Sequence, residues 1–167
     1  MRKPRTGTLN IFKIDLSNQI KDHRHMNKKY IFTGETIQHE GITLHRIQAL
    51  RSFGDVKDGE VGGWIQKESN LWHDGNCWVG EEAKAFEDSF VFGNSQVVGE
   101  VSLSGSARVF GNSYLSGSVK VSGYAWVGEN AEVTGKVNLS QRSLVIGKAK
   151  LSGDVQLSGF TCVRGDQ

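Results

Sequence analysis

The sequence predicts an all-β protein: a triangular β-helix (solenoid) of about five 18-residue coils, with a small N-terminal β cap and a basic N-terminal arm. Three observations predict it: a glycine every six residues, an alternation of small and aliphatic residues between those glycines, and a valine every eighteen residues. A fixed short period is typical of solenoids. We expect residues 1–27 to form the arm, 28–74 the β cap and 75–167 the hexapeptide-repeat β-helix.

Glycine opens a six-residue repeat that fills residues 75–164, which is fifteen repeats in ninety residues. Glu81, Glu87, Glu129 and Gln141 replace it at four places. The third residue of each repeat is small and the fifth is aliphatic, so alternation with period two predicts a short strand that buries both. Glycine supplies the positive φ that a tight corner needs. Each repeat is therefore predicted to be one strand and one corner.

A second period of eighteen residues is superimposed on the first. Valine takes the small position at Val101, Val119, Val137 and Val155, while the repeats between them carry Ser or Ala. Eighteen residues make three strands and three corners, so each coil is predicted to be a triangle. Five coils at about 4.8 Å each give a prism about 24 Å tall. Stability then comes from contacts between neighbouring coils.

Composition and charge limit the functional classes. A length of 167 residues allows one domain. Cys77 takes an inward position and Cys162 an outward one, so we expect no disulfide, reduced thiols and a cytoplasmic location. We find no secretory signal in the basic start and no apolar run of membrane-spanning length.

The N-terminal arm is basic. Residues 1–30 carry eight Lys or Arg and two Asp, whereas residues 31–167 carry twelve basic and sixteen acidic residues. Such an arm is usually a solvated tail. It is also the part of the chain through which nucleic acid could be contacted. A third interpretation is that translation starts at Met26, which would make the preceding residues dispensable.

The cap is predicted to contain strands at 30–32, 36–38 and 42–45, with a turn at Glu40-Gly41. Its last part and the first repeats carry a resemblance. The quoted residues are Gly62-Gly63-Trp64-Ile65, Glu68 and Gly75-Asn76-Cys77-Trp78-Val79, preceded by Ile42–Val56. This stretch resembles the YdcK-like β-helix proteins of bacterial and phage genomes. The resemblance implies a single-stranded, left-handed β-helix over residues 28–164, and it implies no activity and no functional residues.

Sorting the outward residues by eighteen separates three faces. One corner carries a column of Asn at residues 76, 94, 112 and 130, either bonded side chain to side chain or simply favoured beside glycine. The second face is polar. The third face carries large apolar residues in contiguous columns, more than a soluble surface tolerates singly. We therefore predict a protein interface, made by Phe90, Phe92, Phe110, Tyr124, Trp126, Leu144, Ile146 and Phe160.

Three occupants of that third face are considered: a second copy of the chain, a foreign protein partner, or the strand-like segment 11–16 folding back. The first is favoured. Catalysis is weighed separately, because left-handed hexapeptide helices often serve as acyltransferases with a catalytic histidine. No histidine lies within the fifteen repeats. His73 is the one candidate general base, and packing in the cap is the favoured role for it.

No cofactor and no metal site are predicted. Asp22, His23 and His25 offer three ligands, but an exposed arm gives them no preformed geometry. We interpret the protein as a non-catalytic β-solenoid that binds proteins or self-assembles. The resemblance implies that a phage or prophage encodes it and that its cytoplasmic location is in a bacterial host cell. A narrower hypothesis is an inhibitor of a host defence nuclease complex. The alternative from another class is a hexapeptide-repeat acyltransferase. Expected partners are a second copy or a host protein complex, and no membrane.

Overall fold

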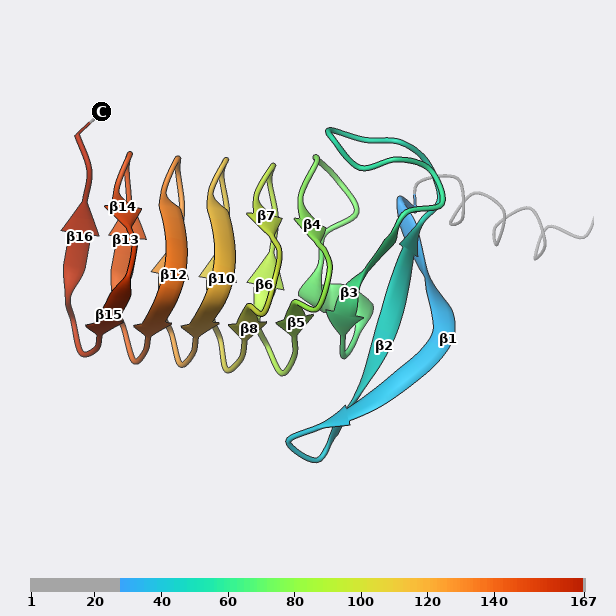
Figure 1. Cartoon of the computed structure of the whole chain (residues 1–167), viewed down its shortest axis with the longest axis horizontal. Coiled ribbons are helices and arrows are strands. Elements are labelled where there is room, and N and C mark those ends of the chain that lie inside the picture. The colour runs from blue at the N-terminus through green and yellow to red at the C-terminus, as the bar shows by residue number, and fades with distance from the viewer. Residues whose placement is uncertain (1–27, 167) are drawn as a thin grey trace, which may run out of the picture.

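A row of stacked coils makes up most of the chain in a computed structural model, with a β-hairpin folded over one end (Figure 1). The structure describes residues 28–166. Interpretations that concern the arm, the Met26 start, segment 11–16 and the histidines at 23 and 25 lie outside the described residues.

The cap holds three strands and one short 3-10 helix: β1 (Tyr30–His39), β2 (Ile42–Ala49), β3 (Val61–Ile65) and η1 (Glu68–Asn70). The coils hold thirteen strands: β4 (Trp78–Val79), β5 (Lys84–Ala85), β6 (Phe90–Val91), β7 (Gln96–Val97), β8 (Ser102–Leu103), β9 (Arg108–Val109), β10 (Tyr114–Val121), β11 (Trp126–Val127), β12 (Glu132–Leu139), β13 (Leu144–Ile146), β14 (Lys150–Leu151), β15 (Asp154–Leu157) and β16 (Cys162–Arg164). No helix within residues 28–166 has the length and apolar character needed to cross a membrane.

The coil strands pair in parallel with the strand eighteen residues further along, which confirms the predicted period. Three ladders result. The first runs β4, β7, the start of β10, the start of β12 and β14. The second runs β3, β5, β8, the end of β10, the end of β12 and β15. The third is a separate five-stranded sheet in the order β6, β9, β11, β13 and β16. The coils are therefore triangular, as predicted.

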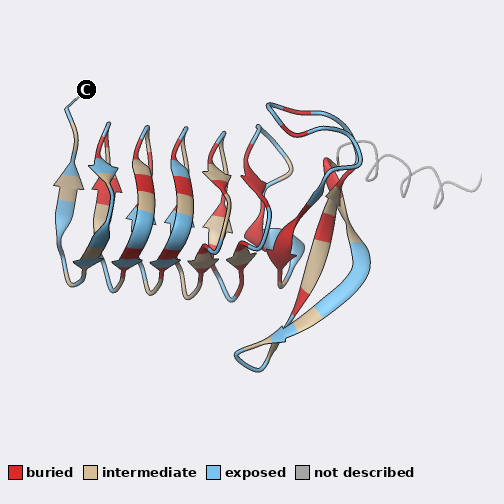
Figure 2. Cartoon of the chain, in the orientation of Figure 1, coloured by how far each residue is buried: buried red, intermediate tan, exposed pale blue. Residues whose placement is uncertain are grey.

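The core is the inside of the prism, where the third and fifth residues of each repeat point. Val119 and Val137 lie in register on β10 and β12 and are both buried. Figure 2 shows buried stretches interrupted by exposed ones along the coils that precede the last one. In the last described coil the inward residues Val155 and Val163 are only half-buried.

The corners need a left-handed backbone. Gly93, Gly111 and Gly147 have φ between 72° and 75°. The four residues that replace glycine also adopt positive φ, from 54° at Glu81 to 62° at Glu129. The corners that lack glycine therefore keep the same backbone conformation, and the β-carbon of the replacing residue adds a steric cost.

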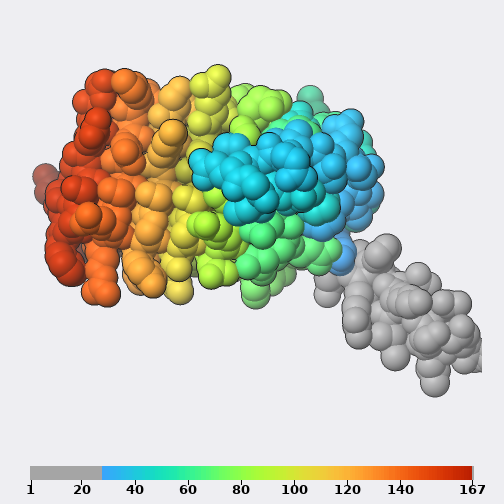
Figure 3. Space-filling view, turned by 90° about the horizontal axis from the view of Figure 1, so that it is seen from below, coloured from blue at the N-terminus to red at the C-terminus, as the bar shows by residue number. Residues whose placement is uncertain are grey.

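The hairpin of β1 and β2 is antiparallel, and its register is interrupted between Phe32 and Thr36. The sequence predicted two strands, 30–32 and 36–38; the structure has one strand with this irregularity, at Gly34 with φ 97°. Glycine lets a strand continue through such a bulge. Figure 3 shows the hairpin lying against the first coils. There Leu44, Trp64 and Phe86 form a small apolar cluster.

The stacking begins earlier than the repeats indicate. Strand β3 pairs antiparallel with β2 on one side and parallel with β5 on the other, matching Trp64 to Lys84. Leu71 bridges Val91 in parallel. Residues 61–72 therefore form a further turn on top of the five predicted coils. Its spacing from the first complete coil is twenty residues, because the segment between Trp72 and Trp78 holds two residues more than the matching segment of that coil.

Candidate interaction face

The third ladder carries the candidate site. We call the outward side chains of β6, β9, β11, β13 and β16, their flanking corner residues and Trp72 the aromatic face. Phe90 pairs in register with Arg108, Arg108 with Trp126, and Trp126 with Leu144. Each of these side chains alternates with a buried valine on the same strand. The local pattern of one inward and one outward residue thus directs all of them to the same surface.

The aromatic rings contact each other from coil to coil. Trp72 meets Phe90 edge to face at 5.6 Å, and Phe90 stacks on Phe92 at 4.9 Å between ring centroids. Phe92 stacks on Phe110 at 5.4 Å, and Phe110 meets Trp126 edge to face at 6.3 Å. A continuous chain of rings therefore runs from Trp72, at the cap end of this face, to Trp126. Such pairs add stabilisation beyond their buried area.

Four aromatic residues of this face remain open to solvent. Trp72, Tyr124, Trp126 and Phe160 are 49, 63, 40 and 83% exposed. The other members of the predicted interface, Phe90, Phe92, Phe110, Leu144 and Ile146, are half-buried. The structure thus brings all eight predicted interface residues to one side of the prism.

Within the repeats, arginine is confined to this face. Residues 75–166 contain three arginines, and all three, Arg108, Arg142 and Arg164, lie on the aromatic face, whereas the five lysines of that range lie elsewhere. The guanidinium of Arg108 lies 5.2 Å from the Trp126 ring centroid. The guanidinium of Arg142 lies 5.8 Å from the Tyr124 ring centroid and 5.5 Å from that of Phe160. Arginine, unlike lysine, stacks its planar group on aromatic rings.

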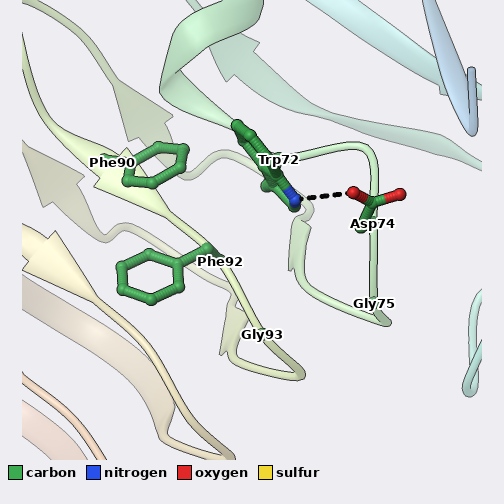
Figure 4. Close-up of a pocket in the computed structure, with 6 residues that line it drawn as sticks. All are labelled: Trp72, Asp74, Gly75, Phe90, Phe92 and Gly93. Atoms are coloured by element: carbon green, nitrogen blue, oxygen red, sulfur yellow. Dashed lines mark hydrogen bonds between the residues drawn. The ribbon is translucent and has the colours of Figure 1, made fainter.

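A shallow hollow lies where the aromatic face meets the cap (Figure 4). It measures about 320 Å³ and is lined by Trp72, Asp74, Phe90 and Phe92 with two corner glycines. Asp74 Oδ2 accepts a hydrogen bond from Trp72 Nε1 at 3.0 Å, which fixes the indole. Trp72 was not predicted to belong to this face, because it precedes the repeats. Arg142 was also missed, although its place in the eighteen-residue column could have revealed it.

His73 is packed within the cap. The Lys29 backbone N–H donates to His73 Nδ1 at 3.3 Å, and the imidazole stacks on Tyr30 with centroids 4.3 Å apart. Burial lowers the pKa of His73. Because Nδ1 accepts a hydrogen bond, the neutral ring carries its proton on Nε2, which lies 4.0 Å from Glu68 Oε2. Neither nitrogen then offers a free lone pair to a substrate.

The remaining candidate sites are structural. Asn94 Nδ2 donates to Asn112 Oδ1 at 3.0 Å, and Asn112 Nδ2 donates to Asn130 Oδ1 at 3.1 Å, so the predicted Asn column is hydrogen-bonded. Cys77 is buried, Cys162 is exposed, and neither forms a disulfide. Within residues 28–166 no three His, Cys, Asp or Glu side chains are grouped to hold a metal ion.

No protein-family profile matches the chain. The chain is similar to a protein of Escherichia coli (strain K12) described as "Uncharacterized acetyltransferase YdcK". The two are 37% identical over 67 residues, which cover 40% of this chain and 21% of that protein. The matched stretch is thus about a fifth of the length of the curated relative. This similarity agrees with the resemblance inferred from residues 42–79, and the β-solenoid agrees with the fold that it implied.

Proposed function

We propose that this protein is a non-catalytic β-solenoid that binds proteins through the aromatic face. The observation that carries the proposal is the composition of that face: exposed Trp and Tyr side chains with stacked arginines, and no lysine from residues 75–166. Interfaces are enriched in aromatic residues and Arg and depleted in Lys. Trp, Tyr and Arg also supply most of the residues on which binding energy concentrates. A rigid prism presents them without a large ordering cost.

Affinity capture with matched variants tests this function. The parent and the variant Trp126→Lys/Leu144→Lys are immobilised and exposed to host lysate, and the retained proteins are compared by mass spectrometry. We expect at least one stoichiometric protein to be retained by the parent and lost by the variant. Lys120→Glu/Asn138→Lys, which changes outward residues on the second ladder, is the control and should retain it. Capture that is the same for parent and face variant would contradict the proposal.

An acyltransferase is the second candidate, and the description of the E. coli relative as an acetyltransferase is what favours it. The packing of His73 argues against that residue as a general base, because its Nδ1 is engaged by Lys29 N–H. Incubation with acetyl-CoA and a panel of amines, with release of free CoA measured, separates the two candidates. If the parent releases CoA and the His73→Gln variant does not, the protein is an acyltransferase and the non-catalytic proposal is wrong.

The narrower hypothesis, a phage-encoded inhibitor of a host nuclease complex, requires a surface that substitutes for nucleic acid. Such a surface needs free acidic side chains, and Glu82 in the first complete coil is engaged within the chain. Glu82 accepts hydrogen bonds from Trp64 Nε1 at 3.2 Å and Arg46 Nη1 at 3.1 Å. Trp64 and then Arg46 lower the pKa of Glu82. Inhibition of nuclease cleavage by the purified protein would be the direct measurement for this narrower form.

A further inference from the structure

The aromatic face has an order along the prism as well as a composition. In the column at the edge of the sheet, Asp88 stands in the first complete coil and Arg142 in the fourth. In the central column Arg108 stands in the second coil and Trp126 in the third. In the edge column the acidic residue thus precedes the midpoint and the basic residue follows it. In the central column the basic residue precedes the midpoint and Trp126 follows it.

Under a two-fold axis, this order places complementary residues of two copies opposite each other. Let two copies meet face to face about a two-fold axis that lies in the interface and runs parallel to the strands. The coils of the second copy then run in the opposite order, while each column of one copy faces the same column of the other. With the axis between the second and third coils, the first coil of one copy meets the fourth of the other. Closed two-fold contacts of this type are the commonest in soluble oligomers, and each pair then occurs twice.

We propose that the aromatic face is the interface of an antiparallel, two-fold symmetric dimer of this chain, with Asp88 of each copy opposite Arg142 of the other. The proposal rests on the protein-binding function proposed above and names the partner as a second copy. Asp88 Oδ1 lies 2.9 Å from Lys67 Nζ at an exposed position, so the carboxylate can also accept from a guanidinium. Two charge pairs would therefore form for every dimer.

The other facing pairs match in the same register. Arg108 of one copy meets Trp126 of the other, which extends to a second molecule the cation–π contact that both already make within the chain. Phe90 meets Leu144. At the centre, the Phe110 ring covers Gly128, where an added Cβ would lie 2.1 Å from Phe110 Cζ. Glycine at this position therefore keeps the middle of the face level enough for close approach.

Trp72 and Arg164 form the outermost match. Trp72 belongs to the turn above the first complete coil, because Trp72 N donates to Val91 O at 3.0 Å. Arg164 ends the same column in the last described coil, in register with Ile146. The two-fold operation places Arg164 of one copy over the indole and the Asp74 carboxylate of the other. The hollow of Figure 4 is thereby filled by a partner guanidinium.

The size of the face sets the strength of the dimer. Six turns at about 4.8 Å and a strand width of about 16 Å give about 500 Å² for each copy, or about 1,000 Å² in total. This is at the low end of specific interfaces. We therefore expect self-association that depends on protein concentration.

Charge reversal tests the register. Sedimentation equilibrium of the full chain should give twice the 18.4 kDa monomer mass at high concentration. Asp88→Arg places Arg opposite Arg, and Arg142→Asp places Asp opposite Asp, so each should raise the dissociation constant at least about tenfold. The double variant Asp88→Arg/Arg142→Asp should restore association. An equal mixture of the two single variants should do so too, because each heterodimer then pairs Arg with Asp at both places.

The matched control exchanges the charges of Lys136 and Asp154, whose Nζ and Oδ2 lie 3.3 Å apart on the second ladder, and it should leave the mass unchanged. A parent that is monomeric at every concentration would overturn the dimer. Single variants that associate like the parent, or a mixture that stays monomeric, would overturn it as well. A monomeric parent whose captured partner still depends on Trp126 would leave the proposed protein-binding function standing.

Discussion

Lys29 Nζ donates hydrogen bonds to Cys77 Sγ at 3.1 Å and to the Cys77 carbonyl oxygen at 2.7 Å, where the cap meets the first repeat. The amine is buried beside Phe53, with Nζ 5.0 Å from the ring centroid. Burial lowers the pKa of Lys29 and raises the pKa of Cys77. This contact ties the residue before β1 to the prism, across almost fifty residues of chain.

We predict that Lys29→Ala lowers the free energy of unfolding by about 2–4 kcal/mol, because it opens a cavity and leaves a buried carbonyl oxygen without its donor. Lys28→Ala is the control. Lys28 pairs with Glu68 at the surface, so its loss should cost less than about 1 kcal/mol. Urea denaturation followed by tryptophan fluorescence measures both. Equal losses would show that the buried amine does not anchor the cap.

The pH dependence of stability should reveal the contribution of the neutral His73 side chain. Its ordinary pKa of 6.5 is lowered in the folded chain by burial, with Glu68, Lys28, Lys29 and Asp74 around it. The unfolded chain therefore takes up the proton first as the pH falls. The contribution of His73 to stability is complete above about pH 6.5 and is lost as the pH falls through the folded pKa.

Thermal unfolding of the parent and His73→Phe between about pH 7.5 and pH 5 measures this effect. Phenylalanine keeps a ring against Tyr30 but cannot be protonated. We expect the melting temperature of the parent to fall more steeply than that of the variant on the acidic side. Parallel curves for the two proteins would mean that another group carries the acid dependence.

The interior of the prism should reject a charge. Val119 and its neighbour Val137 are buried in register, so Val119→Asp places an unpaired carboxylate inside the coils. We expect a loss of several kcal/mol or failure to fold. The adjacent outward residue Lys120, which is exposed on the same strand, offers the control Lys120→Asp, and its melting temperature should change little. A Val119→Asp chain that melts like the parent would show that the side chain is not inside.

The coils could be predicted from the sequence because each strand is specified by its own six residues. The alternation that buries Val119 and exposes Trp126 is local. The eighteen-residue period then identifies the residue that lies beside each of them in the next coil. The turn that carries Trp64 and Leu71 escaped prediction, because its neighbours lie twenty residues away. The two extra residues lie between Trp72 and Trp78, so the eighteen-residue period does not extend back into this turn. The same gap concealed Trp72 as part of the aromatic face.

Substitutions at the corner glycines should lower stability by different amounts. Some add only backbone strain, and others also add a steric clash with the next coil. Gly153 has φ 83° and open space around its Cα, whereas a Cβ at Gly117, with φ 86°, would lie 2.8 Å from Gly135 O in the next coil. Gly153→Ala should therefore cost only the left-handed backbone strain of about 1–2 kcal/mol. Gly117→Ala should cost more, because the two coils must also separate.

Gln141 is the reverse case, because it takes the glycine position with φ 59°. Gln141→Gly should relieve that strain and raise the free energy of unfolding by about 1 kcal/mol. Guanidinium denaturation of the three variants beside the parent gives the ranking, with Gln141→Gly above the parent, then Gly153→Ala, then Gly117→Ala. If Gly117→Ala and Gly153→Ala were equally destabilised, contact between stacked corners would contribute nothing. If Gln141→Gly were destabilised, the glutamine side chain would stabilise its corner by more than the backbone strain costs.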